Sequence, residues 1–198
     1  MTEILAVASA HGRFQPLHNE HLEYLRRAKD RCEFLWIGIT MPDITPLHLN
    51  PLGRHRERPD ANPLTYFERT SIISEALAGL GINKTAFDFV PFPIETPPSL
   101  DNYLPTHIPC LTTVCEPWNR EKITVLEHLG YSVIVLFERT EKQITGADIR
   151  RRIREGDETW RSSVPTATVR ATERLNLRSR LTRIHSQLIS ASETGQSQ

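Results

Sequence analysis

The stretch His11–Leu22, HGRFQPLHNEHL, lies between a short apolar run, Ile4–Ser9, and a segment whose apolar residues recur at helical spacing from about Glu20. It therefore forms the junction between a first strand and a first helix. A helix N-terminus offers unpaired backbone N–H groups and the positive end of a dipole, and both favour an anion. Gly12 lets a ligand approach the backbone, and Arg13 adds a permanent charge. We expect this junction to bind a polyphosphate.

Apolar β-type runs alternate with helical patterns along most of the chain. Strands are predicted at Ile4–Ser9, Glu33–Ile39, Phe87–Phe92, Cys110–Val114 and Ser132–Phe137. Helices are predicted from about Glu20, over Thr65–Leu80, Trp118–Leu129, Ile149–Glu155 and Arg170–Leu188, with Pro165 opening a further one. The alternation predicts an α/β fold in which a parallel sheet carries helices on both faces. Ligands of such sheets bind at the carboxyl ends of the strands, where the first junction lies.

The length of 198 residues suits one principal domain. We expect an α/β domain over residues 1–164, a C-terminal helical extension over 165–189 packed on it, and a disordered polar tail over 190–198. The segment Met41–Pro63 contains five prolines and a basic run, Arg54–Arg58. This loop is either a lid that closes over phosphates or a solvated insertion.

Composition limits the partners of the chain. Lys+Arg and Asp+Glu both number 24, so no global field attracts nucleic acid or an anionic membrane. The three cysteines, Cys32, Cys110 and Cys115, have no metal-binding spacing and cannot all pair. We expect neither a signal peptide nor a membrane span, because no basic region precedes the first apolar run and no apolar stretch is long enough to cross a membrane. We expect a cytoplasmic protein that contacts neither nucleic acid nor membrane.

His18 and His21 admit three interpretations. An H-x-x-H pair can bind zinc, although further Cys or acidic ligands are missing nearby. The histidines are alternatively ordinary polar residues of a loop. Their clustering with glycine, arginine and glutamine at one strand-to-helix junction favours the third interpretation, contact with phosphate.

Three segments carry a resemblance to a known family. Residues 12–25, GRFQPLHNEHLEYL, resemble the G-R-x-Q-P-x-H-x-G-H-L opening of archaeal-type nicotinamide mononucleotide (NMN) adenylyltransferases, within the HxGH nucleotidyltransferase superfamily. Residues 62–69, NPLTYFER, are similar to the family's N-P-F-T-x-x-E-R segment. Residues 144–165 resemble its S-G-T-x-I-R-R-R-M stretch and the W-x-x-L-V-P that follows. The segments keep the family order, and the resemblance covers roughly residues 5–175.

The resemblance implies a Rossmann-like nucleotidyltransferase fold and attack by a substrate phosphate on the α-phosphorus of a nucleoside triphosphate, most simply ATP. Positioning and charge stabilisation would supply the catalysis. The catalytic residues it implies are His18, His21 and Arg13. The triphosphate-binding residues it implies are Gly12, Phe14, Gln15, Thr145, Gly146 and Arg150. Mg²⁺ would be held mainly by phosphates and water rather than by protein side chains.

The chain departs from the family pattern at three places. Glu20 replaces the glycine between the histidines, and Ala147 replaces a hydroxyl residue. The segment Val114–Trp118 stands where the family has S-G-N-P. The triphosphate end is thus better preserved than the acceptor pocket. The candidate acceptor residues are Glu20, Tyr103, Trp118 and Arg139.

These patterns predict a nucleotidyltransferase that joins a phosphorylated small-molecule acceptor to a nucleotide and releases pyrophosphate. The leading interpretation is NMN adenylyltransferase-like, converting ATP and NMN to NAD. The alternative is a cytidylyltransferase or another nucleotidyltransferase that acts on a different phosphorylated or phosphonate metabolite. A nucleotide-binding regulator with weakened catalysis is the alternative of another class, favoured by Glu20 and Ala147. Related enzymes often assemble, so a homo-oligomer is compatible with the sequence.

Overall fold

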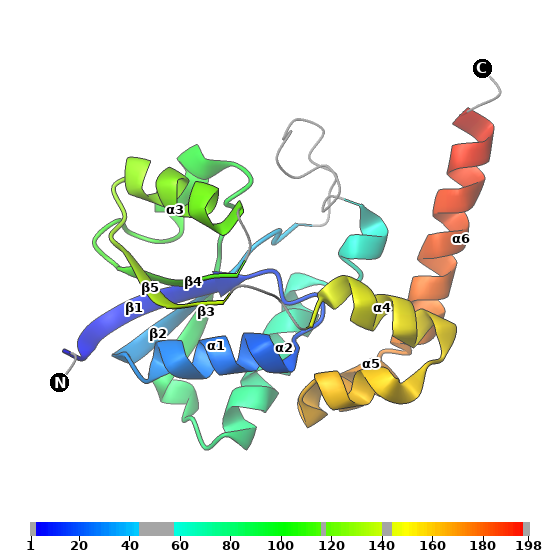
Figure 1. Cartoon of the computed structure of the whole chain (residues 1–198), viewed down its shortest axis with the longest axis horizontal. Helices are drawn as coiled ribbons and strands as arrows, with labels where there is room; N and C mark the ends of the chain where they lie inside the picture. Colours follow the sequence, from blue (N-terminus) through cyan, green and yellow to red (C-terminus); the bar gives the residue numbers. More distant parts are fainter. Residues whose placement is uncertain (1–2, 44–57, 116–117, 140–143, 196–198) are drawn as a thin grey trace.

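The computed structural model of the chain describes residues 3–43, 58–115, 118–139 and 144–195. Five strands form one parallel sheet in the order β3-β2-β1-β4-β5 (Figure 1). The strands are β1 Leu5–Gly12, β2 Cys32–Ile39, β3 Phe87–Pro91, β4 Cys110–Val114 and β5 Val133–Glu138. The predicted α/β class and the parallel sheet are confirmed.

Helices connect the strands and continue beyond the last one. The α-helices are α1 Asn19–Lys29, α2 Tyr66–Gly79, α3 Trp118–His128, α4 Gly146–Glu155, α5 Thr166–Arg174 and α6 Leu177–Gly195. Short 3-10 helices are η1 Pro59–Ala61, η2 Lys84–Ala86, η3 Pro97–Asn102 and η4 Glu158–Ser163. The helix predicted from Thr65 begins with a capping box, in which Thr65 and Glu68 each bond the other's backbone N–H.

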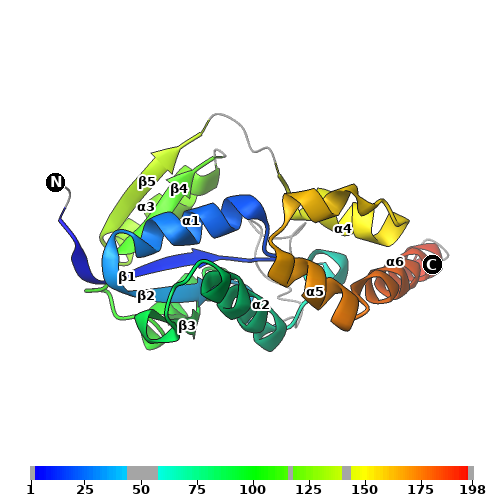
Figure 2. The same cartoon turned by 90° about the horizontal axis from the view of Figure 1, so that it is seen from below.

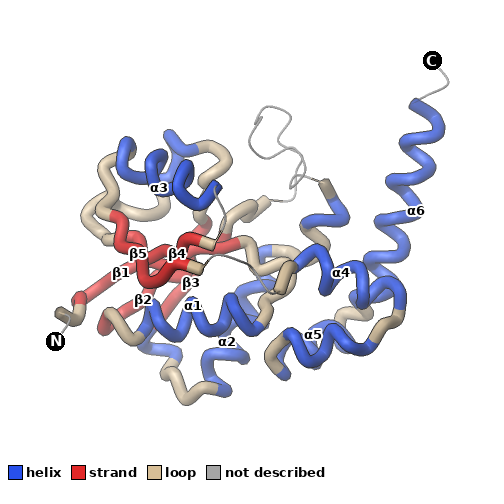
Figure 3. Tube along the Cα trace, in the orientation of Figure 1, coloured by secondary structure: helices blue, strands red, loops and turns tan. Residues whose placement is uncertain are grey.

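Helices cover both faces of the sheet. Helices α1 and α2 lie on one face and α3 lies on the other, as Figures 1 and 2 show from two directions. Two buried clusters correspond to these faces: Leu25, Ile37 and Ile73 belong to the cluster on the α1 side, and Phe92 and Leu126 to the other. Helices α4 and α6 lie beyond the carboxyl ends of the strands (Figure 3). No helix of the described ranges is both long and apolar enough to cross a membrane.

The first strand is longer than predicted. The sequence predicted a strand over Ile4–Ser9 and a loop from Gly12, but β1 continues through Gly12 itself. The extension is a tertiary effect, since β2 offers a parallel partner along the whole strand and aligns Gly38 with His11. His11 therefore belongs to the sheet rather than to the turn.

The C-terminal helical region also differs from the prediction. A single helix was predicted over Arg170–Leu188, but α5 and α6 are separated at Asn176, whose φ of 46° lies in the left-handed region. Pro165 is the N-cap residue of α5 rather than its first helical residue. Helix α6 continues to Gly195, so residues 190–195 are helical and not the predicted disordered tail; residues 196–198 lie outside the described ranges.

Helices α5 and α6 share the core of the sheet. Ala167, Ala171 and Leu177 belong to the same buried cluster as Leu25 and Ile37. The boundary at residue 164 therefore stays a prediction, and the extension is held by the same apolar packing as the α/β layers. The basic run Arg54–Arg58 falls outside the described residues except for Arg58, which pairs with Asp60 at 3.0 Å.

Candidate active site

The segment that follows β1 turns sharply before α1 begins. Phe14 has a φ of 52°, in the left-handed region that a bulky residue adopts only when its surroundings impose it. Its ring packs beneath Gly12, where an added Cβ would lie 2.8 Å from the ring. The Gln15–Pro16 peptide bond is cis. Gly12 is thus required by packing, and Phe14, which is 1% exposed, supports the turn from below.

His18 and His21 are brought together at the start of α1. His18 is the N-cap residue, and its Nδ1 accepts a hydrogen bond from the backbone N–H of His21 at 3.4 Å. The two imidazoles stack with ring centroids 3.5 Å apart, and the edge of Phe14 meets His21 at 5.1 Å. An accepting Nδ1 assigns the proton of a neutral His18 to Nε2. The pair is therefore an ordered unit at a helix N-terminus, and His18 is buried rather than part of an open loop.

A second helix N-terminus meets the same turn. An added Cβ on Gly146, the first residue of α4, would lie 2.8 Å from the carbonyl oxygen of Gln15. Arg150 Nη1 donates to that same oxygen at 2.5 Å. Thr145 caps α4 by accepting a hydrogen bond from the N–H of Asp148. The two segments that resemble one family are thus in contact, although Gln15 and Arg150 are 135 residues apart.

Gln15 and Arg150 are occupied by contacts within the protein. The Gln15 side-chain amide donates to the carbonyl of Leu64 at 2.8 Å and accepts from the Leu64 N–H at 3.0 Å. Arg150 is 9% exposed, and burial lowers its pKa to about 10, so it remains charged at neutral pH. These contacts favour a positioning role for both residues, which hold the turn against α4 and against Leu64, just ahead of the N-cap residue of α2.

Arg69 is a residue that the sequence argument missed. Its side chain is 1% exposed and donates to the carbonyls of Arg13 at 3.0 Å, Thr40 at 2.7 Å and Met41 at 2.7 Å. Burial lowers the pKa of Arg69 to about 10, so the guanidinium keeps its charge. Met41, like Phe14, has a positive φ, of 48°. Arg69 thus ties the ends of β1 and β2 together beside both strained residues. Arg69 is the last residue of NPLTYFER, and the similarity of this segment to the family's N-P-F-T-x-x-E-R could have pointed to it.

Glu20 is neutralised by a cation. Arg139, which follows β5, lies 3.7 Å from the Glu20 carboxylate and 2.5 Å from that of Glu23. The hydrogen bond from Arg139 holds the pKa of Glu23 below its ordinary value. Two predicted acceptor residues, Glu20 and Arg139, are therefore neighbours. Glu20, which replaces the family glycine, therefore has a cation beside it in the first turn of α1.

The other predicted acceptor residues belong to the segments that follow β3 and β4. Trp118 begins α3, and the ammonium of Lys122 lies 5.3 Å from its ring centre. Tyr103 follows η3 and is 47% exposed. Glu95, which comes after β3, also escaped the sequence argument: burial raises its pKa, opposed by the nearby charges of Arg13 and Arg69.

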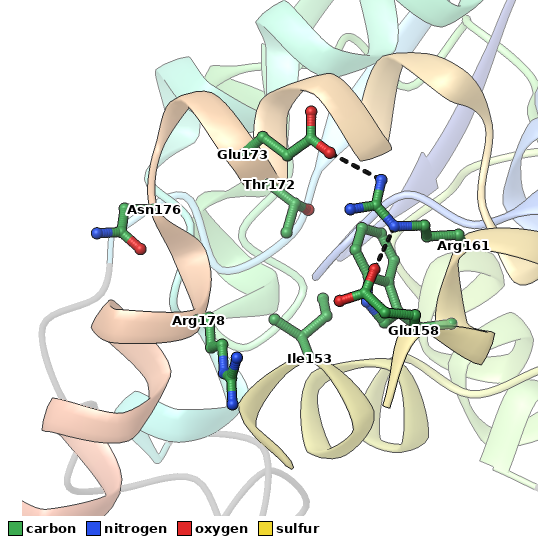
Figure 4. Close-up of a pocket in the computed structure, with 8 residues that line it drawn as sticks. Ile153, Glu158, Arg161, Thr172, Glu173, Asn176 and Arg178 are labelled. Atoms are coloured by element: carbon green, nitrogen blue, oxygen red, sulfur yellow. Dashed lines mark hydrogen bonds and ion pairs between the residues drawn. The ribbon is translucent and has the colours of Figure 1, made fainter. Parts of the chain in front are cut away.

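A separate pocket of about 140 Å³ lies among α4, η4, α5 and the start of α6 (Figure 4). Three of its charged residues pair with one another, since Arg161 bonds Glu158 on one side and Glu173, at 2.7 Å, on the other. None of its lining residues is among the predicted site residues. The pocket belongs to the packing of the C-terminal helices.

The fold and the site define an α/β protein whose parallel sheet presents two helix N-termini to one turn, an arrangement suited to phosphate. Comparison with known proteins identifies the family. The chain is 35% identical over 179 residues to phosphonoformate cytidylyltransferase of Streptomyces viridochromogenes, a match that covers 90% of this chain and 97% of that protein. It is 30% identical over 159 residues to the nicotinamide-nucleotide adenylyltransferase of Thermococcus sibiricus, covering 80% of this chain and 78% of that protein. The corresponding protein of Picrophilus torridus is 28% identical over 176 residues, with 86% and 92% covered.

A solved structure matches the fold. It is a bifunctional NMN adenylyltransferase/ADP ribose pyrophosphatase from Francisella tularensis in complex with AMP and a manganese ion, with a TM-score of 0.66 and 14% identity. The match covers all of this chain and 57% of that one, so this chain spans little more than half of that protein. A scan against models of protein families finds no match.

The chain belongs to the nucleotidyltransferase family that includes phosphonoformate cytidylyltransferase and the archaeal nicotinamide-nucleotide adenylyltransferases. It is an enzyme of the adenylyltransferase or cytidylyltransferase type. The family predicted from the three sequence segments is thereby confirmed.

Replacement of Arg69 tests its part in the site. In Arg69→Leu, four backbone carbonyls, those of Arg13, Thr40, Met41 and Thr65, lose a charged donor, and we expect the free energy of unfolding to fall by about 3 kcal/mol or more. The exposed Arg151, which pairs with Asp148 and Glu155 on its own helix, is the control. Arg151→Leu should cost less than about 1 kcal/mol. Urea unfolding measures the free energy of unfolding of both variants. If Arg69→Leu does not fold, Arg69→Lys is measured in its place. Equal, small losses in the two positions would contradict the assignment.

Proposed function

We propose that the enzyme transfers a cytidylyl group from CTP to an oxygen of a small acceptor that carries a phosphonate or phosphate. The observation that carries this proposal is the 35% identity to phosphonoformate cytidylyltransferase across 97% of that protein. The altered segment Val114–Trp118 supports it, because the family's NMN pocket uses S-G-N-P there. Adenylyl transfer from ATP to NMN is the second candidate, favoured by the adenylyltransferase relatives at 28–30% identity.

The reaction needs no covalent intermediate with the protein. An oxygen of the acceptor attacks the α-phosphorus and forms a new P–O bond. The bond from the α-phosphorus to the bridging oxygen breaks, and pyrophosphate leaves with the electron pair. Catalysis then rests on alignment of the two anions and on stabilisation of the charge that develops on the leaving group.

The N-termini of α1 and α4 supply the donors for that charge. His18 and His21 would hold the triphosphate from the first turn of α1, and the amides after Thr145 would contact its terminal phosphates. Arg13 would add charge at the end of β1. Gly146 permits this arrangement by its close contact with Gln15. Gln15, Phe14 and Arg150 fit the shaping of the turn better than direct contact with the triphosphate, because their groups are buried in protein contacts.

A divalent cation accompanies the triphosphate in this proposal. The bound manganese and AMP of the Francisella tularensis protein support it. In the described ranges, no group of three or more His, Cys, Asp or Glu side chains could hold a metal ion. We infer an ion such as Mg²⁺, which is commonly held by phosphate oxygens and water. When bound, the ion neutralises charge on the phosphates, while the residues above position them.

The contact between Arg139 and Glu20 supports an active enzyme over a weakened regulator. A carboxylate beside the triphosphate would otherwise repel it at close range. Arg139 supplies the opposite charge from the end of β5. Its side chain also packs on Phe137, with the guanidinium carbon 4.9 Å from the ring centre, so the cation is held in place.

Pyrophosphate release with paired substrates tests the proposed function. CTP and ATP are each offered with phosphonoformate and with NMN, in the presence of Mg²⁺. We expect CTP with phosphonoformate to give the highest kcat/KM, by about tenfold or more over ATP with NMN. A preference for ATP and NMN would establish the second candidate. Release with none of the pairs would contradict both.

Substitution of His21 tests the role of the histidine pair. His21→Ala should lower kcat by about 10²–10³, the scale for loss of a preorganised donor. The exposed His107 is the control, and His107→Ala should keep kcat within about twofold. His18 is the less suitable target because it caps α1 and is buried, so its loss also affects stability. Near-normal turnover in His21→Ala, with a normal Tm, would remove the histidine pair from the mechanism.

A further inference from the structure

His11 is a buried polar side chain that the functions assigned so far do not use. It is 4% exposed, and within the described residues neither Nδ1 nor Nε2 has a hydrogen-bond partner. Buried polar groups are almost always hydrogen-bonded, because desolvation without a partner is costly. A valine or leucine at this position would fill the same space without that cost. The imidazole therefore requires an explanation beyond packing.

The ring of His11 is firmly positioned. It stacks on Phe92, with ring centroids 4.1 Å apart and planes inclined by 4°. Its backbone N–H donates to Tyr24 Oη at 3.0 Å. Gly38 on β2 leaves room for the stack, since a Cβ there would lie 2.9 Å from His11 Cβ and 2.7 Å from Phe92 Cδ2. A positioned ring with unpaired nitrogens is preorganised for a ligand rather than loosely placed.

The location and charge of the surroundings point to the ligand. His11 is the next-to-last residue of β1, at the carboxyl edge where parallel sheets bind ligands. Its contact with Phe92 places it on the α3 face, opposite the face on which His18 and His21 begin α1. Burial, assisted by the charge of Lys122 on α3, lowers the pKa of His11 well below its ordinary value. The ring is therefore neutral, with one N–H donor, beside a positive charge.

We propose that His11 is a specificity-determining residue for the acceptor. The imidazole N–H donates a hydrogen bond to a carboxylate or phosphonate oxygen of the acceptor, and Lys122 balances the negative charge of the acceptor. The inference rests on the proposed function, because it names the acceptor side of the same reaction. In this arrangement the two substrates bind on opposite sides of the carboxyl end of β1. The triphosphate lies toward α1 and α4, and the acceptor lies toward α3. The predicted acceptor residue Trp118, which contacts Lys122, belongs to the same side.

Substitution of His11 by phenylalanine isolates the hydrogen bond. His11→Phe keeps an aromatic ring against Phe92 and removes both nitrogens. We expect the KM for phosphonoformate to rise about 10- to 100-fold, the effect of losing one hydrogen bond to a charged group, with the KM for CTP within about twofold. His11→Asn, which retains a donor, should show a smaller rise. The exposed His128 of α3 is the control, and His128→Phe should leave both constants unchanged. A wild-type KM for phosphonoformate in His11→Phe would overturn the proposal, and so would equal rises in both constants with a lowered Tm.

A binding measurement separates this inference from the proposed function. In the wild-type enzyme with ¹⁵N-labelled histidine, phosphonoformate added after a non-hydrolysable CTP analogue should shift the His11 ring nitrogens. The analogue alone should not. If the enzyme transfers nothing to phosphonoformate, the proposed function fails, and the same titration with inorganic phosphate and NMN still tests His11. Ring signals that none of these anions moves would overturn the acceptor role.

Discussion

The carboxyl edge of the sheet depends on one buried cation. The Arg69 guanidinium reaches from α2 to the carbonyls of Arg13, Thr40 and Met41, so one planar fork fixes the ends of two adjacent strands. Its charge strengthens each of these hydrogen bonds in a region from which water is excluded. Phe14 and Met41 then hold backbone conformations that their side chains disfavour. The turn that carries the histidines starts from this anchor.

The turn between β1 and α1 also connects the start of α1 to the start of α4. Its Gln15 uses the side chain to pair with the backbone of Leu64 and the carbonyl to receive Arg150. Gly146 packs on the same peptide group, so α4 begins directly beside the segment that leads into α1. Each of these contacts joins elements far apart in the sequence. The N-termini of α1 and α4 therefore lie beside the same turn, and this arrangement suits a ligand with several adjacent negative charges.

Local chemistry made much of this predictable. Thr65 with Glu68 and Thr145 with Asp148 are capping patterns that fix helix starts, and the apolar runs located the strands to within a few residues. The extension of β1 to Gly12 was not predictable in the same way, because it depends on pairing with β2. The break between α5 and α6 occurs at a residue that no glycine or proline marks.

The predicted membership of the site stays a prediction, and the structure adds the contacts that its residues make. Glycine, arginine and histidine at the first junction pointed to phosphate, and the structure brings that junction against Gly146. The functions of Gln15 and Arg150 depend on which polar groups become buried, and a linear sequence does not reveal this. The pairing of Glu20 with Arg139 joins α1 to the end of β5, and a contact between residues so far apart in the chain is not readable from a linear sequence. His11 was not among the predicted site residues, because a sequence does not show that both ring nitrogens are buried without a hydrogen-bond partner among the described residues.

In the proposed function, α1 and α4 present their N-termini to one triphosphate. A crystal structure of the enzyme with Mg²⁺ and a CTP analogue whose α,β-bridge is methylene tests it directly. We expect phosphate oxygens within hydrogen-bond distance of His18 or His21 and, in the same molecule of analogue, of the backbone amides after Thr145. A triphosphate bound away from α4, or one that contacts the protein without either histidine, would contradict it.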